Sequence, residues 1–189
     1  HFDERGSRQG IYYAHQRGCK VLLALNTYPQ PQSWPIWEEA VDKAAALVVY
    51  ALILADPGLI AYAARSHPEL RLHLSVQGSA TSAEAIAFYK ERFNIQRVVL
   101  PRVLSLSQVK RVIANTDVEV ETLAFGSLCV MVEGRCYLSS YATGESPNTC
   151  GACSPAKSAR GEETRQGRHA RLRGRLIDSD GADANAGWP

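Results

Sequence analysis

Short apolar runs alternate with amphipathic segments through residue 125 of this 189-residue chain, and this alternation constrains the fold more than any other feature. Five of the runs have the length and the aliphatic, β-branched composition that is typical of β-strands. They cover residues 21–25, 51–55, 72–76, 97–100 and 118–125. Strands that alternate with helices pair in parallel through helical crossovers. The sequence therefore predicts an α/β fold built on a parallel sheet.

Helices are expected between these strands. Ser33 can cap a helix that carries Pro35 in its first turn, and apolar residues then recur at three- and four-residue steps as far as position 48. Thr81 and Glu84 have the spacing of a capping box, and Ser105 precedes a further amphipathic segment. Another helix is expected near residues 8–16.

Periodicity alone fits either a (β/α)8 barrel or an open doubly wound sheet. A complete barrel usually needs about 250 residues, and no strand precedes the helix expected near residues 8–16. We therefore predict a partial (β/α)8 TIM-type barrel with parallel strands, lacking at least the first strand. In this interpretation the partial barrel occupies residues 1–126 and a cysteine-rich segment follows over 127–156. Residues 157–189 form a charged tail, either ordered or disordered.

Polar residues stand where four of the predicted strands end. They are Asn26, Asp56, Gln77 and Arg102. In barrel folds the carboxyl ends of the strands carry the active site, so these four side chains are candidates for a substrate-binding rim. Each could instead cap a helix or hold a turn, because such residues are favoured at those positions.

His73 lies in the third predicted strand, on the same side as Ser75 and Gln77 by two-residue alternation. It could face a barrel interior and take part in catalysis. We favour a structural role, because buried polar groups are usually hydrogen-bonded and one histidine does not make a triad. The sequence contains no HExxH zinc-protease motif and no phosphate-binding glycine loop, and no residue is assigned as catalytic.

Four of the five cysteines fall within 25 residues, at positions 129, 136, 150 and 153. No apolar run approaches the roughly 20 residues that span a bilayer, and no signal peptide is evident, so a cytoplasmic location is expected. Thiols in that compartment stay reduced, and clustered thiolates favour zinc or an iron–sulfur cluster. The spacing C-x6-C-x13-C-x2-C is not that of a zinc ribbon. Burial as small apolar residues is the alternative, and it is what we predict for Cys19.

The chain has nearly balanced charges, with 21 Lys and Arg against 19 Asp and Glu, so it has no overall attraction for polyanions. A basic stretch near the C-terminus is the exception, with arginines at 165, 168, 171, 173 and 175. Nucleic-acid binding there is one hypothesis. Flanking acidic residues and the lack of aromatic residues that could stack on bases argue against it.

The segments Ala124-Phe-Gly-Ser-Leu-Cys129, Glu133-Gly-Arg-Cys136-Tyr-Leu-Ser-Ser-Tyr141, Thr143-Gly-Glu-Ser-Pro-Asn-Thr149 and Gly151-Ala-Cys153-Ser-Pro-Ala156 are long and specific motifs. With further matches back to about residue 10, the chain resembles the collagenase-like peptidase family U32, in particular its ubiquinone-biosynthesis (UbiU) branch. The resemblance implies a barrel with a 4Fe-4S cluster whose ligands include Cys129, Cys136 and Cys153. Cys150 has no counterpart in the pattern, and Val48 stands where glycine is expected.

The resemblance also implies a function. A protein of this branch would act with a homologous UbiV-like partner in oxygen-independent hydroxylation of a ubiquinone precursor. Peptidase activity and RNA hydroxylation are the alternatives within the same family. The fourth cluster ligand is expected just beyond the segment that matches Ala186-Gly-Trp-Pro189, where the sequence stops, so an inactive fragment is a further alternative.

Overall fold

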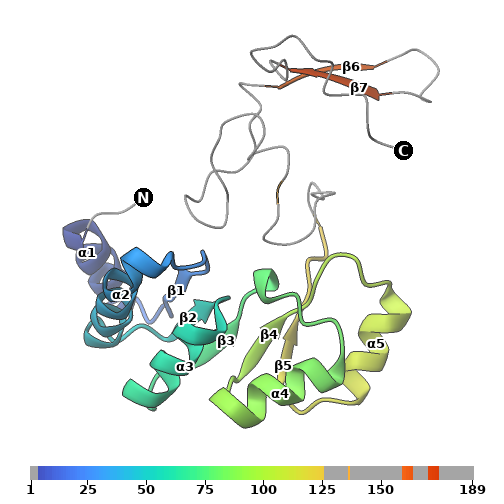
Figure 1. Cartoon of the computed structure of the whole chain (residues 1–189). Helices are drawn as coiled ribbons and strands as arrows, with labels where there is room; N and C mark the ends of the chain where they lie inside the picture. The colour runs from blue at the N-terminus through green and yellow to red at the C-terminus, as the bar shows by residue number, and fades with distance from the viewer. Residues whose placement is uncertain (1–3, 126–135, 137–158, 164–169, 175–189) are drawn as a thin grey trace. The chain divides into compact units, whose positions relative to one another are not determined.

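The structure is a computed structural model that describes residues 4–125, 136, 159–163 and 170–174 (Figure 1). It comprises two compact units, residues 1–134 and 135–189. In the first unit the elements run in the order α1 (Glu4–His15), β1 (Leu22–Leu25), η1 (Pro31–Ser33), α2 (Trp34–Ala46), β2 (Ala51–Leu54), α3 (Pro57–Ser66), β3 (Leu72–Leu74), η2 (Val76–Gly78), α4 (Ala83–Phe93), β4 (Arg97–Val99), α5 (Leu106–Ala114) and β5 (Glu119–Glu121).

The five strands of this unit form one parallel sheet in the order β1-β2-β3-β4-β5. Sequential order with right-handed crossovers puts every crossover helix on the same face of the sheet. A doubly wound sheet would instead reverse its strand order at a switch point. The predicted parallel α/β fold is confirmed, and its sequential strand order is the order found in (β/α)8 barrels. The described strands form an open sheet, so barrel closure stays a prediction.

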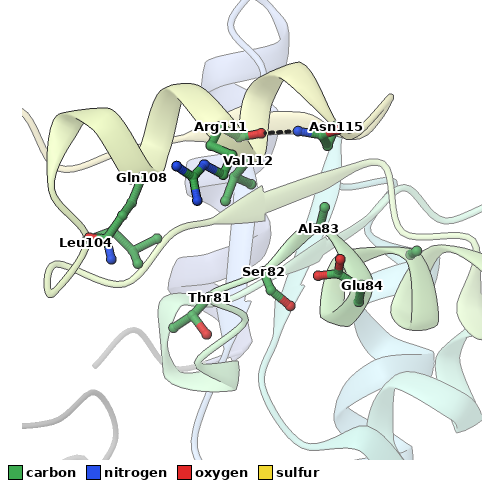
Figure 2. A pocket seen from close by; sticks show the side chains of 10 residues that line it. Thr81, Ser82, Ala83, Glu84, Leu104, Gln108, Arg111, Val112 and Asn115 are labelled. Atoms are coloured by element: carbon green, nitrogen blue, oxygen red, sulfur yellow. Dashed lines mark hydrogen bonds between the residues drawn. The ribbon is translucent and has the colours of Figure 1, made fainter.

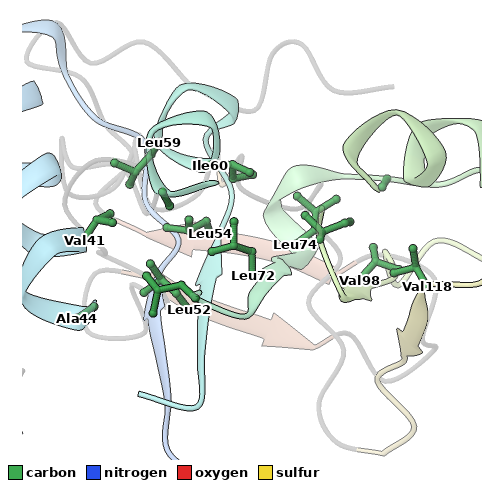
Figure 3. Close-up of a cluster of buried hydrophobic side chains, with 14 of the residues drawn as sticks. Val41, Ala44, Leu52, Leu54, Leu59, Ile60, Leu72, Leu74, Val98 and Val118 are labelled. Atoms are coloured by element: carbon green, nitrogen blue, oxygen red, sulfur yellow. The ribbon is translucent and has the colours of Figure 1, made fainter. Parts of the chain in front are cut away.

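The hydrophobic core lies between the sheet and the crossover helices (Figure 3). Leu52 and Leu72 are register partners, as are Leu54 and Leu74, so their side chains form rows on the helix-facing side. Val41 and Ala44 of α2, Leu59 and Ile60 of α3, Ile86 of α4 and Val112 of α5 complete the core. Burying each such aliphatic side chain stabilises the fold by about 1.5–3 kcal/mol before entropy is counted.

The strands are shorter than predicted by one to five residues, because the flanking residues turn into loops and η2. Helix α3 was not predicted, although Asp56 before Pro57 is a helix-start pattern. Ser33 occupies the predicted N-cap of α2, but its side chain makes no capping bond to the helix. The prediction that Thr81 caps α4 is wrong.

Ser82 caps α4 instead, since its hydroxyl accepts a hydrogen bond from the Ala85 N–H. The predicted cap of α5 is confirmed. There Ser105 and Gln108 form a reciprocal capping box. Cys19, which we predicted to be buried, is exposed because it follows Gly18 in the turn after α1.

The second unit contains one antiparallel pair, β6 (Ala159–Glu163) with β7 (Ala170–Gly174), in which Glu162 is the register partner of Arg171. These strands lie within the predicted charged tail. Most of the predicted cysteine-rich segment, residues 127–156, lies outside the described residues. Among the described helices, none combines the length and apolar character needed to cross a membrane.

Candidate functional site

The carboxyl edge of the sheet carries the residues that we predicted as a substrate rim. Asn26 and Arg102 lie half-buried in the loops that follow β1 and β4. Asp56 and Gln77 follow β2 and β3. The parallel arrangement therefore places all four on loops at the same edge, which is where open and closed α/β sheets bind ligands.

Asp56 acts as a helix cap. Its Oδ1 accepts a hydrogen bond of 2.8 Å from the Leu59 N–H, and its carbonyl accepts one from Ile60. A Cβ at Gly58 would lie 3.1 Å from this Oδ1 and 3.2 Å from the Trp34 ring, so the first turn of α3 fits closely around the carboxylate. The cap interpretation holds for Asp56, and contact with a substrate stays a prediction.

Two hydrogen bonds, one long-range and one local, hold the backbone of Gln77. The Tyr28 hydroxyl donates a 2.7 Å hydrogen bond to its carbonyl from 49 residues away. Its backbone N–H donates to Ser75 Oγ at 3.3 Å. The side-chain Oε1 is buried and accepts no hydrogen bond among the described groups. A buried acceptor without a donor is costly, so this atom could accept an O–H or N–H from a ligand or from ordered water.

The cysteine segment follows β5 in the sequence. Cys136 is half-buried, whereas Cys129, Cys150 and Cys153 lie outside the described residues. Within the described ranges, no group of three His, Cys, Asp or Glu side chains could hold a metal ion. The iron–sulfur cluster that the resemblance implies, with cysteine thiolates as ligands, therefore stays a prediction.

A charged layer of Arg71, Arg97, Glu119 and Glu121 lies on one face of β3, β4 and β5. Arg71 donates to Glu119 at 2.8 Å, and Arg97 contacts both Glu119 and Glu121, the latter at 3.2 Å. Arg97 and Glu119 are register partners, which explains why their side chains meet. The two-residue alternation of side chains along a strand could have predicted that these charged residues share one face of the sheet. It could not have predicted that they form ion pairs.

His73 lies above this layer and is 1% exposed. Its Nε2 accepts a 3.1 Å hydrogen bond from Arg71 Nε, so Nδ1 carries the proton of the neutral ring. Burial, followed by the charges of Arg97 and Arg71, lowers the pKa of His73 from 6.5 to about 4. His73 is thus buried and hydrogen-bonded, as predicted, and its structural role stays a prediction.

A groove of about 540 Å³ separates the start of α4 from α5 (Figure 2). Ser82 and Glu84 line one side, and Gln108 and Arg111 line the other. Asn115 Nδ2 donates a 2.7 Å bond to the Arg111 carbonyl at one end. Sequence reasoning did not predict this groove, which arises from the packing of two helices. None of the four predicted rim residues lines it.

The profile of peptidase family U32 matches residues 1–169. This chain belongs to peptidase family U32. An uncharacterized protease of Methanocaldococcus jannaschii is 38% identical to it over 150 residues, which are 77% of this chain and 36% of that protein. The tRNA hydroxylation protein P of Escherichia coli is 32% identical over 156 residues, covering 82% of this chain and 34% of that protein.

The collagenase of Porphyromonas gingivalis is 31% identical over 148 residues, covering 72% of this chain and 34% of that protein. The chain thus spans about a third of the length of the curated relatives that it matches. A solved U32 peptidase aligns with a TM-score of 0.54 and 21% identity, over 64% of this chain and 51% of its own. This likeness supports the U32 fold.

Proposed function

We propose that this chain is part of an iron–sulfur hydroxylation protein of family U32, of the UbiU type. It would act with a UbiV-like homologous subunit in the oxygen-independent hydroxylation of a ubiquinone precursor. One observation carries this proposal: the three cysteines Cys129, Cys136 and Cys153 within the long motifs that resemble that branch. A bound 4Fe-4S cluster would supply one-electron transfer. The fourth ligand would be Cys150 or a residue outside this chain.

The rim residues would position the substrate. Gln77 Oε1 is the best candidate, because it is a buried acceptor and a phenolic O–H of a ring precursor is a donor of matching chemistry. Tyr28 fixes the backbone of Gln77 and thereby the direction of its side chain. Arg102 and Asn26 lie on loops of the same edge and would contact polar substituents. His73, the middle residue of β3, is given no role in this scheme, because its Nε2 is already bonded to Arg71.

Hydroxylation of tRNA is the second candidate function. Relatives that are 30–35% identical to this chain carry the name tRNA hydroxylation protein in Bacillus subtilis, Escherichia coli and Helicobacter pylori. The same cluster chemistry would serve hydroxylation of either the ubiquinone precursor or tRNA. Peptide cleavage, which the names of the protease and collagenase relatives suggest, is the remaining alternative. It would need a nucleophile or a metal site, and the described residues bring together no group of metal ligands.

Cluster binding can be tested by anaerobic purification with iron and sulfide analysis and a visible spectrum. We expect near four iron per chain, and loss of the visible absorption in Cys129→Ala, Cys136→Ala and Cys153→Ala. Cys19→Ala is the matched control, because Cys19 is exposed and belongs to the turn after α1. An iron content that is the same in all four variants would contradict the assignment.

The substrate can be tested by complementation under anaerobic conditions. One strain would lack the endogenous ubiquinone hydroxylation subunit, and a second would lack the tRNA hydroxylation protein. Restored ubiquinone with unchanged tRNA supports the first candidate. Restored hydroxylated tRNA alone favours the second. Peptide cleavage that survives removal of all three cysteines would replace both with the peptidase function.

A further inference from the structure

The α5 side of the groove between α4 and α5 presents hydrogen-bond donors (Figure 2). Gln108 and Arg111 are three residues apart on α5, so their side chains share one face of the helix, and both line the groove. Gln108 Oε1 accepts hydrogen bonds from the Ser105 N–H at 2.8 Å and from the Ser105 hydroxyl at 2.9 Å. The capping box therefore occupies the amide oxygen of Gln108 and leaves its NH2 group as a donor beside the Arg111 guanidinium.

The start of α4 forms the opposite wall and presents acceptors. Thr81 and Glu84 are three residues apart there, and both line the groove. The Ser82 hydroxyl between them already accepts the Ala85 N–H at 3.2 Å as the helix cap. The carboxylate of Glu84 is therefore the charged group of this wall, and it can only accept hydrogen bonds. Its place in the first turn of α4 suits a negative charge.

The two charges of the groove are not neutralised by their neighbours. Among the residues that the structure describes, neither Glu84 nor Arg111 forms an ion pair. On α2, by contrast, Glu39 and Lys43 pair directly at 3.0 Å. The helices that carry Glu84 and Arg111 face each other across the groove (Figure 2). Opposite charges thus stand on opposite walls, with the groove between them.

Apolar side chains make up much of the remaining lining. Ala83 and Ala87 contribute from α4, and Leu104 and Val112 contribute from the α5 side. Val112 is 6% exposed and belongs to the hydrophobic core, so this part of the groove is anchored in the packed interior. A volume of about 540 Å³ lies in the range of roughly 300–1,000 Å³ that is usual for small-molecule sites. An apolar lining with a few polar groups is also typical of such sites.

We propose that this groove binds a small zwitterion of the amino-acid class. The ammonium group of the ligand would bind the Glu84 carboxylate, and its carboxylate would accept hydrogen bonds from Arg111 and Gln108. An apolar side chain of the ligand would lie against Leu104 and Val112. Glu84 repels a simple anion and Arg111 repels a simple cation, so a ligand with both charges is favoured over either. None of these residues has a part in the proposed cluster or substrate rim.

The test is an NMR titration of the isotope-labelled 189-residue protein with three probes. L-leucine carries both charges, N-acetylleucine carries the negative charge alone, and leucinamide, at a pH where it is protonated, carries the positive charge alone. Both charged walls are exposed to solvent, so we expect leucine to bind with a dissociation constant on the order of 1 mM. The other two probes should bind about fivefold more weakly. The amide resonances of Ala83 and Arg111 should shift.

Variants of the two walls test which residue recognises which charge. Glu84→Gln should bind leucine and N-acetylleucine with equal affinity, because the ammonium group has lost its partner. Arg111→Gln should bind leucine and leucinamide with equal affinity for the corresponding reason. Glu91→Gln on α4 and Lys110→Gln on α5 are the matched controls, since both residues are exposed and neither lines the groove. They should keep the wild-type preference, and thermal unfolding verifies that each variant is folded.

Four outcomes would overturn the proposal. Leucine could cause no shifts, or shifts confined to residues outside the groove. N-acetylleucine could bind as tightly as leucine, which would make the groove an anion site without a role for Glu84. Leucinamide could bind as tightly as leucine, which would remove the role of Arg111. The control variants could lose the preference as fully as the wall variants, which would indicate a general effect of net charge. These readouts require neither the cluster nor a partner subunit, so each leaves the proposed function to be judged by its own results.

Discussion

Val48 has a φ angle of 53°, in the left-handed region, and is 73% exposed after the end of α2. A β-branched residue is strained there, whereas glycine adopts this conformation without steric cost. We expect Val48→Gly to raise the free energy of unfolding by about 0.5–1 kcal/mol, since part of the relief is offset by the flexibility of glycine in the unfolded chain. Urea denaturation measures this change. Val103→Gly, at an exposed valine without positive φ, should give no gain.

His73 predicts how stability depends on pH. Its pKa is about 4 in the folded protein and 6.5 in an unperturbed histidine, so the unfolded chain binds more protons between these values. The contribution of neutral His73 to stability is therefore complete above pH 6.5 and is lost as the pH falls to 4. Thermal midpoints across this range should fall less steeply for His73→Gln. His15→Gln, at an exposed position, should keep the wild-type profile.

At the scale of elements, Gly10 weakens α1. Glycine within a helix costs roughly 0.5–1 kcal/mol relative to alanine, and nothing lies within 4 Å of a Cβ added at Gly10. Gly10→Ala should therefore stabilise the protein by about 0.4–1 kcal/mol, with more helical signal in circular dichroism. Gly18→Ala should destabilise it, because Gly18 has a φ of +68° in the turn that follows α1. Equal effects of the two substitutions would argue against this account.

Substitutions of Asp56 can separate its role as the cap of α3 from its predicted role in the substrate-binding rim. Asp56→Ala should lower the free energy of unfolding by about 1 kcal/mol, because the Leu59 N–H loses its acceptor. Asp56→Asn keeps an acceptor oxygen and should retain most of the stability. Measuring hydroxylation in the stable Asn variant then tests the rim prediction. Full activity would show that the carboxylate serves the helix alone.

At the scale of the whole molecule, Arg97 joins the edge strand β5 to β4 through Glu119 and Glu121. Arg97→Gln leaves Glu119 with Arg71 but takes from Glu121 the arginine that it contacts, and should cost about 1 kcal/mol at low salt. The loss should shrink in 1 M NaCl as the charges are screened. Lys43→Gln removes a partner from the exposed pair with Glu39 and should cost less. A salt-independent loss would indicate packing rather than charge.

The fold of the first unit could be predicted from the sequence because its signals are local. Apolar runs and helical periodicity predicted where the strands lie and that they form a parallel sheet, and Ser105 predicted the start of α5. The position of the left-handed residue at Val48 was indicated by an expected glycine. Boundaries were less accurate. Ser82 replaced Thr81 as the cap of α4, since neighbouring hydroxyl residues compete for the same helix start.

Contacts between distant residues could not be predicted. Tyr28 reaches Gln77 across 49 residues, and Arg71 reaches Glu119 across 48, and neither pairing has a local signal. The predicted rim residues lie on loops of one edge because parallel strands align their carboxyl ends. Which of them caps a helix, as Asp56 does, depends on the geometry of the next turn.

The sequence by itself determined the family, the α/β class and the clustered thiols, since each depends on residue type and spacing along the chain. The tertiary structure decided the state of His73, the charged layer beneath it and the outward direction of Tyr12 on α1. These properties depend on burial and on charges brought together from different strands. Burial and distance are set by the packing of the chain in space, and no local pattern in the sequence encodes them.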